Sequence, residues 1–383
     1  MNSADATEHS HGSLPCLSIC IPGYGQQQLV RDCIAHALAY PGNEIEVIVC
    51  DDGSPESLQS VVEAFADSRL RYFRYDENVG HDLNILRCLA HARGEFGFLL
   101  RSRDWIDSNG IETLMRAVKA HPDATYITGS AAAPEGGIRV AYANHVYGRG
   151  AEALGNSWKL LCHPSGGAYN LQRIDVERLR QYLVLKAPGN RAFVVHIMLR
   201  LLAAQEGEIV TLRDPVWVYA RTNEANDLAA NRIADGRSPY APELWQKRYE
   251  LLLRWVTQSI NSRYLTEVIV DLFGFCLEQA TWASRLSARD AGFRAHYGVT
   301  AARGRHSSTE EEFLQITARM LDPEIGPMWD TLVRSARRNR LLGRLRYGIA
   351  VCKQISYGGA RALRVEGMAH RLNEGLRALA SRV

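Results

Sequence analysis

The regular alternation of apolar strand patterns and amphipathic helix patterns over residues 16–129 is the feature that most constrains this fold. Strands are expected at residues 16–21, 45–50, 70–74, 96–100 and 124–129, with helices between them at residues 27–39, 55–66, 82–91 and 109–121. Strands that alternate with helices are joined by right-handed crossovers, which build a mostly parallel sheet buried on both faces. The sequence therefore predicts an α/β fold.

The regular pattern breaks after residue 130. Loops rich in glycine and tyrosine are expected at residues 131–150 and 163–170, followed by helices at 174–182 and 193–205 and strand segments at 208–210 and 216–219. From residue 243 onward helical patterns dominate, with breaks at residues 292–309 and 323–327. The predicted organisation is a loose tail over residues 1–15, an α/β domain over 16–225 and a helical C-terminal region over 240–383.

The cysteines and the hydropathy pattern predict a cytoplasmic protein. The chain has 383 residues and eight cysteines with no C-x-x-C pair, and several cysteines stand in apolar runs. This spacing favours buried, reduced thiols over a disulfide framework or a zinc site. Neither a signal peptide nor a run of 18 uncharged apolar residues is visible, so no membrane crossing is expected.

Charge is distributed very unevenly. Residues 334–383 hold twelve basic residues against two acidic ones, a net charge of +10, which leaves −7 for the rest of a chain whose total is +3. The stretch from Arg334 to Arg382 is suited to an anionic membrane surface, with a solvated face packed on the acidic body as the plainer alternative. Nucleic acid is not expected as a partner, because no recognition motif accompanies the charge.

Short polar and glycine-rich segments follow the predicted strands. They are Pro22-Gly23-Tyr24-Gly25, Asp51-Asp52-Gly53-Ser54, Asn78-Val79-Gly80 and Arg101-Ser102-Arg103-Asp104. The carboxyl ends of parallel strands meet at one edge of a sheet, which is where open α/β sheets bind ligands. Each segment alone also suits helix capping, so their order and spacing carry the prediction of a site.

The chain from residue 16 to residue 223 resembles glycosyltransferase family 2, the inverting transferases of GT-A fold that use nucleotide-diphosphate sugars. Residues 18–25 resemble the family's SIIIPTYN, residues 44–54 its EIIVVDDGS, and residues 78–104 its N-x-G followed by A-x-G-E and F-L-D-x-D-D. The N-x-G-x-D-x-N form, with a histidine on a later helix, is similar to the abequosyltransferase-type branch that builds bacterial surface polysaccharide. The resemblance implies a nucleotide-sugar donor and a glycan or polyprenyl-linked acceptor.

The resemblance also implies roles for particular residues. Tyr24, which follows Pro22, would stack on the base of the nucleotide, Asp52 would hold the edge of the base, and Asp51 would support the turn. Asp82 and Asn84 would contact the ribose or the donor sugar, or else cap the helix that they begin.

The family's metal-binding D-x-D falls on Arg101-Ser102-Arg103-Asp104 in this chain, so both expected metal carboxylates are arginines. Guanidinium groups do not ligate a cation, but they neutralise a diphosphate through bidentate hydrogen bonds. We therefore expect a metal-independent enzyme in which Arg101 and Arg103 bind the diphosphate. Mn²⁺ or Mg²⁺ would be needed only if Asp104 alone sufficed as a ligand, and the alternative is an inactive glycan- or nucleotide-binding protein with the same fold.

Inverting transfer also needs a base that takes the proton of the acceptor hydroxyl. The family's E-D-x-D-L-x-L-R-L helix resembles residues 193–201, where His196 stands at the last acidic position. A histidine is a competent base near neutral pH, although a lone histidine on an apolar helix is more often a core residue. His163, in the glycine-rich segment of residues 163–167, is the rival candidate, and His81 follows it.

Overall fold

The structure is a computed structural model that describes residues 15–161, 163–186, 193–220, 241–289, 291–297 and 307–321, with residues 299, 328, 331, 332 and 334. The chain divides into two compact units. The first comprises Met1–Pro188 and Val195–Thr222, and the second comprises Gly189–Val194 and Asn223–Val383.

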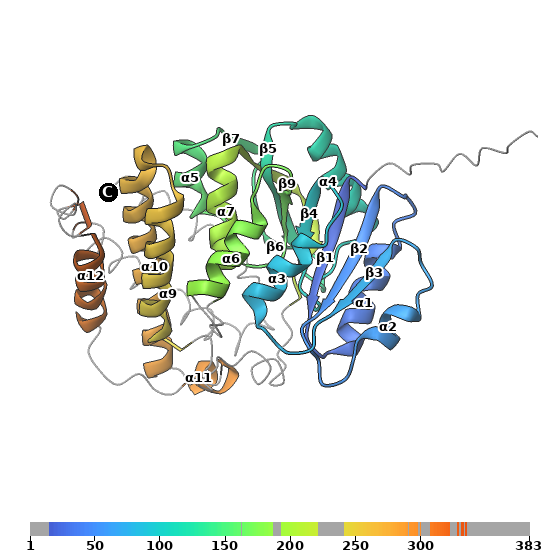
Figure 1. The fold of residues 1–383 in the computed structure, drawn as a ribbon, viewed down its shortest axis with the longest axis horizontal. Helices are drawn as coiled ribbons and strands as arrows, with labels where there is room; N and C mark the ends of the chain where they lie inside the picture. Colours follow the sequence, from blue (N-terminus) through green and yellow to red (C-terminus); the bar gives the residue numbers. More distant parts are fainter. Residues whose placement is uncertain are drawn as a thin grey trace, which may run out of the picture. The chain divides into compact units, whose positions relative to one another are not determined.

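A single mixed sheet forms the centre of the first unit (Figure 1). Its strands are β1 (Leu17–Gly23), β2 (Ile45–Asp51), β3 (Leu70–Arg74), β4 (Phe96–Leu99), β5 (Ala124–Ala132), β6 (Ile138–Val140), β7 (His145–Tyr147), β8 (Gly167–Asn170) and β9 (Glu208–Val218). The strand order is β3-β2-β1-β4-β8-β5-β9-β7, and β6 pairs with β5.

The sheet is less parallel than its sequence pattern predicts. Strands β1 to β4 pair in parallel, as do β5 and β9, but β8 lies antiparallel between β4 and β5, and β6 and β7 are also antiparallel. These three strands are three or four residues long, too short to show an alternating pattern, and they fall in the segments predicted to be loops. Strands β7 and β8 pair with strands far away in the sequence, whereas β6 pairs with the strand just before it.

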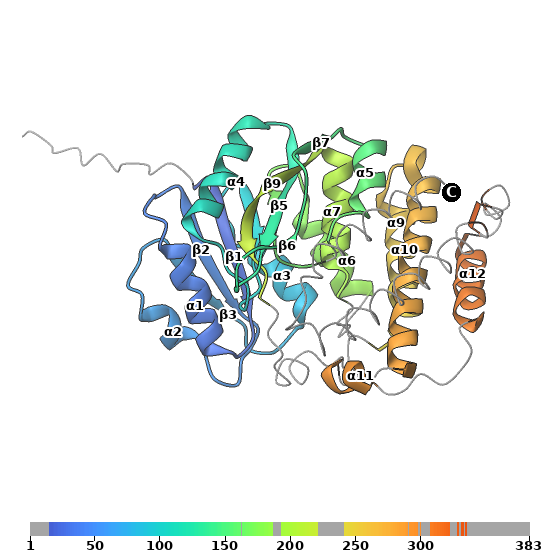
Figure 2. The same cartoon turned by 180° about the vertical axis from the view of Figure 1, so that it is seen from behind.

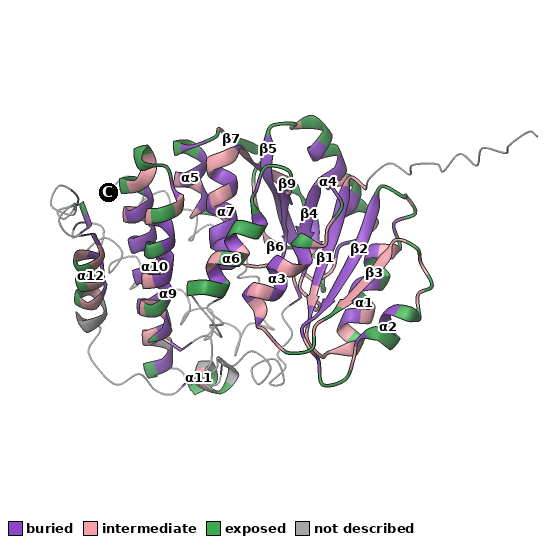
Figure 3. Cartoon of the chain, viewed as in Figure 1, coloured by how far each residue is buried: buried purple, intermediate pink, exposed green. Residues whose placement is uncertain are grey.

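Helices cover both faces of this sheet. They are α1 (Gln27–Leu38), α2 (Gln59–Glu63), α3 (His81–Ala90), α4 (Ser108–Ala120), α5 (Ala151–Ser157), α6 (Val176–Lys186) and α7 (Val195–Glu206). Figure 2, which turns the view of Figure 1 by half a revolution, shows α1 and α2 in front of the strands, whereas α3 stands in front in Figure 1. The central strands β1, β2, β4, β5 and β8 are buried almost throughout (Figure 3), as expected where a sheet is covered on both sides, whereas β3 at the edge is half-buried.

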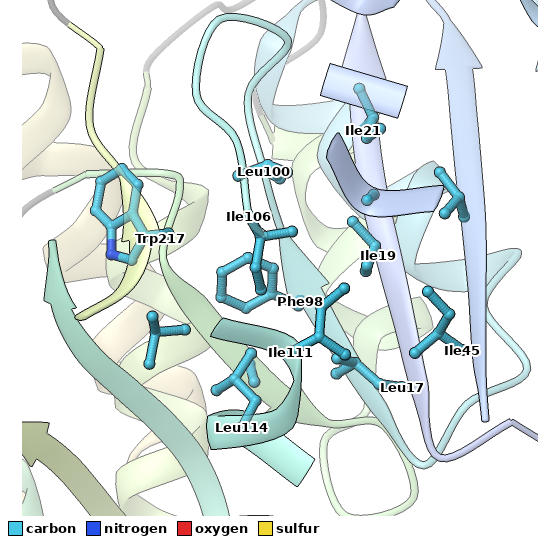
Figure 4. Close-up of a cluster of buried hydrophobic side chains, with 14 of the residues drawn as sticks. Leu17, Ile19, Ile21, Ile45, Phe98, Leu100, Ile106, Ile111, Leu114 and Trp217 are labelled. Carbon is cyan, nitrogen blue, oxygen red and sulfur yellow. The ribbon is translucent and has the colours of Figure 1, made fainter. Parts of the chain in front are cut away.

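The main apolar core lies between the sheet and the layer that contains α1, α2 and α4. Ile19 of β1, Phe98 of β4 and Leu114 of α4 are fully buried in it, and Trp217 of β9 closes its far end (Figure 4). Burying such side chains stabilises the fold by about 1.5–3 kcal/mol each, so the core fixes where the strand ends stand.

Helix α2 is shorter than the predicted helix over residues 55–66. The carboxylate of Asp51 accepts hydrogen bonds from the backbone amides of Ser54 and Leu58, at 2.9 and 3.1 Å. These bonds hold the intervening residues in a turn, and α2 therefore begins only at Gln59.

Strand β9 is one strand where the sequence predicted two segments. Its pairing with β5 shifts register between Gly129 and Ser130 and again between Ser130 and Ala131, opposite Pro215. A proline cannot donate to a ladder, and a bulge is one of the places where a strand tolerates it. The bulge lets β9 continue to Val218, which brings its carboxyl end to the edge described below.

The described part of the second unit is helical, with α9 (Leu244–Ser259), α10 (Ser262–Arg289), α11 (Ala291–Tyr297) and α12 (Ser307–Leu321). Its core contains the ring of Tyr249 stacked on Phe313 at 4.9 Å, with Phe273 edge-on to both rings. Helix α11 occupies part of the break predicted at residues 292–309. The basic stretch beyond Arg334 lies outside the described residues.

Two further predictions concern the cysteine thiols and membrane crossing. In the described part of the chain, the six cysteines are free and all but Cys16 are buried. No described helix combines the length with the apolar run that a membrane crossing requires.

Candidate active site

The functional segments predicted from the sequence converge on one edge of the sheet. Strands β1, β2 and β4 are parallel, so their carboxyl ends share that edge, and the antiparallel β8 begins there. The backbone bond from Gly166 to the carbonyl of Leu99, at 3.0 Å, joins the start of β8 to the end of β4. The arrangement corresponds to the edge at which open α/β sheets bind ligands.

The turn after β1 is joined to the turn after β2. The amide of Gly25 donates to the hydroxyl of Ser54 at 2.7 Å, and Tyr24 stands half-buried beside this contact. Pro22 belongs to the end of β1 and pairs with Cys50. The backbone beside Tyr24 is thus held in place by this hydrogen bond. Stacking of its ring on a nucleobase stays a prediction.

Gly53 is required between the two aspartates and α2. Its φ is +64°, and a Cβ atom there would lie 2.6 Å from the backbone carbon of Glu77. A side chain would meet both the left-handed strain and this clash. The glycine therefore lets the turn after β2 pack directly on the segment that precedes α3.

Asp51 is a buried organiser of the turn. In addition to the amides of Ser54 and Leu58, its carboxylate accepts from the hydroxyl of Tyr72 at 2.8 Å and pairs with Arg74 at 2.6 Å. Burial raises the pKa of Asp51, but hydrogen bonds from Ser54, the amide of Leu58 and Tyr72 outweigh that effect, so the net pKa lies below its usual value. The group is therefore ionised at neutral pH.

Asp52 holds the segment before α3. Its two oxygens accept hydrogen bonds from the amides of Val79 and Gly80, each at 2.9 Å, and its side chain is nearly fully buried. The role expected from the resemblance was contact with the edge of the base. These contacts join Asp52 to the backbone of the N-x-G segment, and the contact with the base stays a prediction.

Asp82 and Asn84 are buried at the start of α3. The amide group of Asn84 donates to the carbonyls of Gly23 and Cys50, at 3.4 and 3.1 Å, and so ties the ends of β1 and β2 to this helix. Asp82 accepts from the amide of Val195 and lies 3.4 Å from His81. Neither residue provides the N-cap of α3, since Gly80 stands there without a side-chain bond.

The loop after β4 is built around the buried carboxylate of Asp104. Arg101 binds it with Nε at 3.1 Å from Oδ2 and Nη2 at 3.4 Å from Oδ1. The hydroxyl of Ser165 donates to Oδ2 at 2.6 Å, and the amide of Ala220 donates to Oδ1 at 3.1 Å. Asp104 therefore joins the ends of β4 and β9 to the start of β8.

Ser165 is a site residue that sequence reasoning missed. Its hydroxyl also accepts the amide of Arg101 at 2.9 Å, so it braces both ends of the Arg101–Asp104 segment. The available signal was its place in the glycine-rich segment of residues 163–167. Ser102 makes a longer contact with Gln26, at 3.4 Å, and Arg103 is half-buried in the same loop.

The imidazole of His163 packs among aromatic rings at this edge. Its ring lies 5.3 Å from that of Trp217 and 4.5 Å from that of Tyr219. Burial, with the charges of Arg101 and His196, lowers the pKa of His163 well below its usual value. The ring is therefore neutral at neutral pH.

His196 lies in the first turn of α7 and is buried. It is close enough for its charge to act on His163, as is His81. Of the three histidines considered from sequence, His163 lies against the Arg101–Asp104 loop, with Nε2 4.0 Å from Asp104, whereas His81 lies beside Asp82 at the start of α3. Trp217, an aromatic that follows the same edge, is a core residue with 3% exposure and offers no open face to a sugar.

In the described loop after β4, the side chains at the expected metal motif do not fit a divalent cation. Two positions of the expected metal motif carry arginine, and the oxygens of Asp104 already accept from Arg101, Ser165 and Ala220. Among the described residues, no group of three or more His, Cys, Asp and Glu side chains is arranged to hold a metal ion.

Curated relatives share the first part of this chain. It is 28% identical over 116 residues to the glycosyltransferase GlyG of Streptococcus pneumoniae, and 30% identical over 120 residues to a GalNAc(5)-diNAcBac-PP-undecaprenol β-1,3-glucosyltransferase of Campylobacter jejuni. Each match covers 30% of this chain and 38% of the relative.

A wider likeness appears among solved structures. The S. aureus protein TarS, residues 1–349, superposes with a TM-score of 0.55 over 86% of this chain and 91% of that chain, at 14% identity. A second structure of the same protein holds UDP-GlcNAc and gives the same TM-score. At this identity the likeness establishes the fold.

The family model for glycosyl transferase family 2 matches residues 18–175. This range contains the segments after β1, β2 and β4 and the start of β8, whereas α7 and β9 lie beyond it. The expected GT-A fold is confirmed by the structural likeness, and the helical C-terminal region is present. Residues 18–175 therefore match glycosyl transferase family 2, and the chain has the GT-A fold.

Proposed function

We propose that this protein is an inverting glycosyltransferase that moves a sugar from a nucleotide-diphosphate donor to a glycan or lipid-linked acceptor in bacterial surface polysaccharide synthesis. The family 2 domain and the relatives named as glycosyltransferases support the activity. The Campylobacter jejuni relative is named for an undecaprenol diphosphate acceptor, which supports the acceptor class. The abequosyltransferase-type branch remains a prediction.

The observation that carries the proposal is that Arg101 and His163 both lie against Asp104 at the strand edge where the family's segments meet, with Arg103 in the same loop. In an inverting transfer the acceptor oxygen attacks the anomeric carbon while the bond from that carbon to the diphosphate oxygen breaks. The departing diphosphate takes the bonding electrons, so positive groups beside it stabilise the transition state.

The two arginines have different roles in this proposal. Arg101 is held by Asp104 and contributes a fixed positive charge to the loop, whereas Arg103 makes the direct contact with the diphosphate. His196 takes the proton of the acceptor hydroxyl. It stands in the first turn of α7, next to Val195, whose amide donates to Asp82. The reaction then needs no divalent cation.

Calorimetric titration with UDP, GDP, TDP and CMP, each with Mn²⁺ and again with EDTA, tests the proposal. We expect tight binding of one nucleotide that EDTA does not weaken, followed by turnover of the matching sugar nucleotide. Binding that requires Mn²⁺ would refute metal independence. Binding without any transfer or donor hydrolysis would favour an inactive binding protein, which the altered metal motif also permits.

Arg103→Ala should weaken binding of the preferred nucleoside diphosphate by about 1.5–3 kcal/mol, because a charge-assisted hydrogen bond is lost. Arg116→Ala is the matched control, since Arg116 is exposed on α4 and its loss changes the net charge equally. Equal nucleotide affinity in the two variants would show that Arg103 does not contact the nucleotide.

Two properties of the whole chain belong to the same proposal. The protein acts at the inner face of the cell membrane, where a lipid-linked acceptor is anchored, and its basic C-terminal stretch binds the anionic surface. Only the charge pattern supports this placement, and it is tested separately below.

A further inference from the structure

The imidazole of His163 is held in a single tautomer. The amide of Ser165 donates to Nδ1 at 3.0 Å, so Nδ1 is the nitrogen with the lone pair and, in the neutral ring, Nε2 carries the proton. A group whose basic nitrogen already accepts a hydrogen bond is a poor acceptor for another proton. This contact separates His163 from His196 as a candidate base.

The proton on Nε2 has no hydrogen-bond acceptor among the described residues. The side chain of His163 is 8% exposed, and Nε2 has no hydrogen-bond partner in the part of the chain that the structure describes. The nearest carboxylate oxygen, Asp104 Oδ2, is 4.0 Å away. That oxygen already accepts from Ser165 and Arg101, which uses both of its lone pairs.

The surroundings of this donor favour an anionic ligand. Arg101, His196 and His81 all act electrostatically on His163, and each disfavours a positive charge on its ring. The ring is kept in place by Trp217 and Tyr219 on its sides, so the N–H direction is fixed before a ligand arrives. A buried donor without an acceptor costs stability, and an oxygen brought by a ligand would remove that cost.

We propose that His163 is a ligand-binding residue that stays neutral and donates its Nε2–H to a phosphate oxygen of the substrate. The proposal rests on the proposed function, because that function brings a diphosphate to this edge. The oxygen belongs either to the diphosphate of the nucleotide donor or to the diphosphate of a lipid-linked acceptor. In both cases His163 supplies a directional hydrogen bond beside the charges of the two arginines.

Two substitutions separate this role from a structural one. In His163→Asn the side-chain oxygen takes the place of Nδ1 and keeps the bond from Ser165, but nothing reaches the position of Nε2. In His163→Gln the terminal amide reaches that position and donates there, but the bond from Ser165 is lost. A ligand-binding role predicts that Asn is the worse replacement, and a purely structural role predicts that Gln is.

Calorimetry on the full chain measures the effect, with EDTA present. Using whichever of UDP, GDP and TDP binds the wild type most tightly, we expect the dissociation constant to rise by about 10- to 100-fold in His163→Asn and to recover to within about fivefold in His163→Gln. The matching nucleoside monophosphate should be affected less if the oxygen is on the β-phosphate. A second titration with farnesyl diphosphate, on nucleotide-saturated protein, detects the acceptor source.

The outcomes are distinct. A loss in His163→Asn toward the nucleotide supports the donor diphosphate, and a loss confined to farnesyl diphosphate supports the acceptor. Unchanged affinity for both ligands in His163→Asn overturns the assignment, as does a larger loss in His163→Gln. If the wild type binds neither nucleotides nor farnesyl diphosphate, the proposed function itself fails, and this role of His163 fails with it.

Nitrogen chemical shifts of the histidine rings provide a measurement that needs no variant. At neutral pH the wild type should show His163 as a neutral ring protonated on Nε2, and the Nε2 resonance should move when the nucleotide binds. A ring protonated on Nδ1, or one that titrates near pH 6.5 as an ordinary base would, contradicts the assignment.

Discussion

At the scale of single residues, the candidate site depends on backbone positions that only glycine satisfies. Gly166 has a φ of +93°, and a Cβ atom there would lie 2.3 Å from the indole nitrogen of Trp217. The residue stands between Ser165 and β8, so it sets the direction in which the bracing hydroxyl of Ser165 enters the Arg101–Asp104 loop.

Gly166→Ala should therefore destabilise the protein more than backbone strain alone explains. Gly136→Ala is a matched control, because Gly136 has the same φ of +93° but a Cβ atom added there would have no neighbour within 4 Å. We expect Gly166→Ala to cost about 1–3 kcal/mol more than Gly136→Ala, owing to the clash with Trp217. Urea denaturation followed by tryptophan fluorescence measures both, and equal midpoints would contradict the packing argument.

The lowered pKa of Asp51 predicts that the folded protein loses stability in acid. Because its pKa is lower in the folded state than the usual 3.8, the folded protein binds this proton less readily than the unfolded chain does. The stabilisation is therefore complete above about pH 5 and is lost as the pH falls through the folded pKa.

Asp51→Asn should lower the free energy of unfolding at neutral pH by about 1–3 kcal/mol, because the bonds from Arg74 and the amides of Ser54 and Leu58 lose their charged acceptor. Between about pH 5 and pH 3 the variant should lose less stability than the wild type. Asp76→Asn, which alters an exposed carboxylate, is the control. Parallel pH curves for wild type and Asp51→Asn would refute the role of this ionisation.

Much of the site could be predicted at this scale, and the rest depended on contacts across the sheet. The double aspartate and the arginine motif follow strands that periodicity locates, so their shared edge follows from parallel pairing. Ser165 donates to Asp104, which lies 61 positions earlier in the sequence. Its position is set by the strand β8 that follows it, and this strand of four residues is not detected by periodicity. The contact partners of Asp52 were likewise invisible, because capping and ligand binding use the same residue types.

At the scale of elements, α4 shows how a loop residue starts a helix. Asp107 has extended backbone, and its carboxylate accepts the amide of Gly110 at 2.8 Å. This bond satisfies one of the unpaired amides at the start of the helix, and the negative charge suits the helix dipole. The helix then places Ile111 and Leu114 in the core behind β4 (Figure 4).

Asp107→Ala should cost about 1 kcal/mol of stability, whereas Asp107→Ser should keep most of it because serine also caps helices. Thermal unfolding by differential scanning fluorimetry compares the two. If both variants unfolded at the same temperature as the wild type, the cap at Asp107 would not contribute to the stability of the protein.

Element prediction succeeded where strands and helices alternate regularly, up to residue 129, and failed mainly for the short strands that follow. The helix predicted at residues 109–121 and the observed α4 differ by one residue at each end. By contrast, β6, β7 and β8 were expected to be loops, and α2 was overextended because the turn held by Asp51 was not foreseen. Local patterns specify what a segment prefers, and distant partners decide the remaining cases.

At the scale of the whole molecule, the uneven distribution of charge bears on the proposed contact with a membrane. The stretch with a net charge of +10 lies at one end of a chain that is otherwise acidic. Basic residues close to an anionic membrane contribute about 1 kcal/mol each, and the attraction weakens as salt rises.

Changing Arg337, Arg338, Arg340 and Arg344 to Gln in the full chain should weaken sedimentation with phosphatidylserine vesicles by more than about tenfold. A control chain carries the same change at the exposed residues Arg116, Arg149, Arg173 and Arg213. Neutral phosphatidylcholine vesicles and high salt should abolish the difference. Equal sedimentation of the two quadruple variants would argue against a surface-binding role for the C-terminal stretch.

The position of β8 imposes an order on the assembly of this sheet during synthesis. Strand β8 lies between β4 and β5, although both of those precede it in the chain. Until residues 167–170 have left the ribosome, β3, β2, β1 and β4 can pair with one another, but nothing connects them to β5. A nascent chain that pauses before that point exposes the unpaired edges of β4 and β5, and the second edge of β5 stays unpaired until β9 emerges.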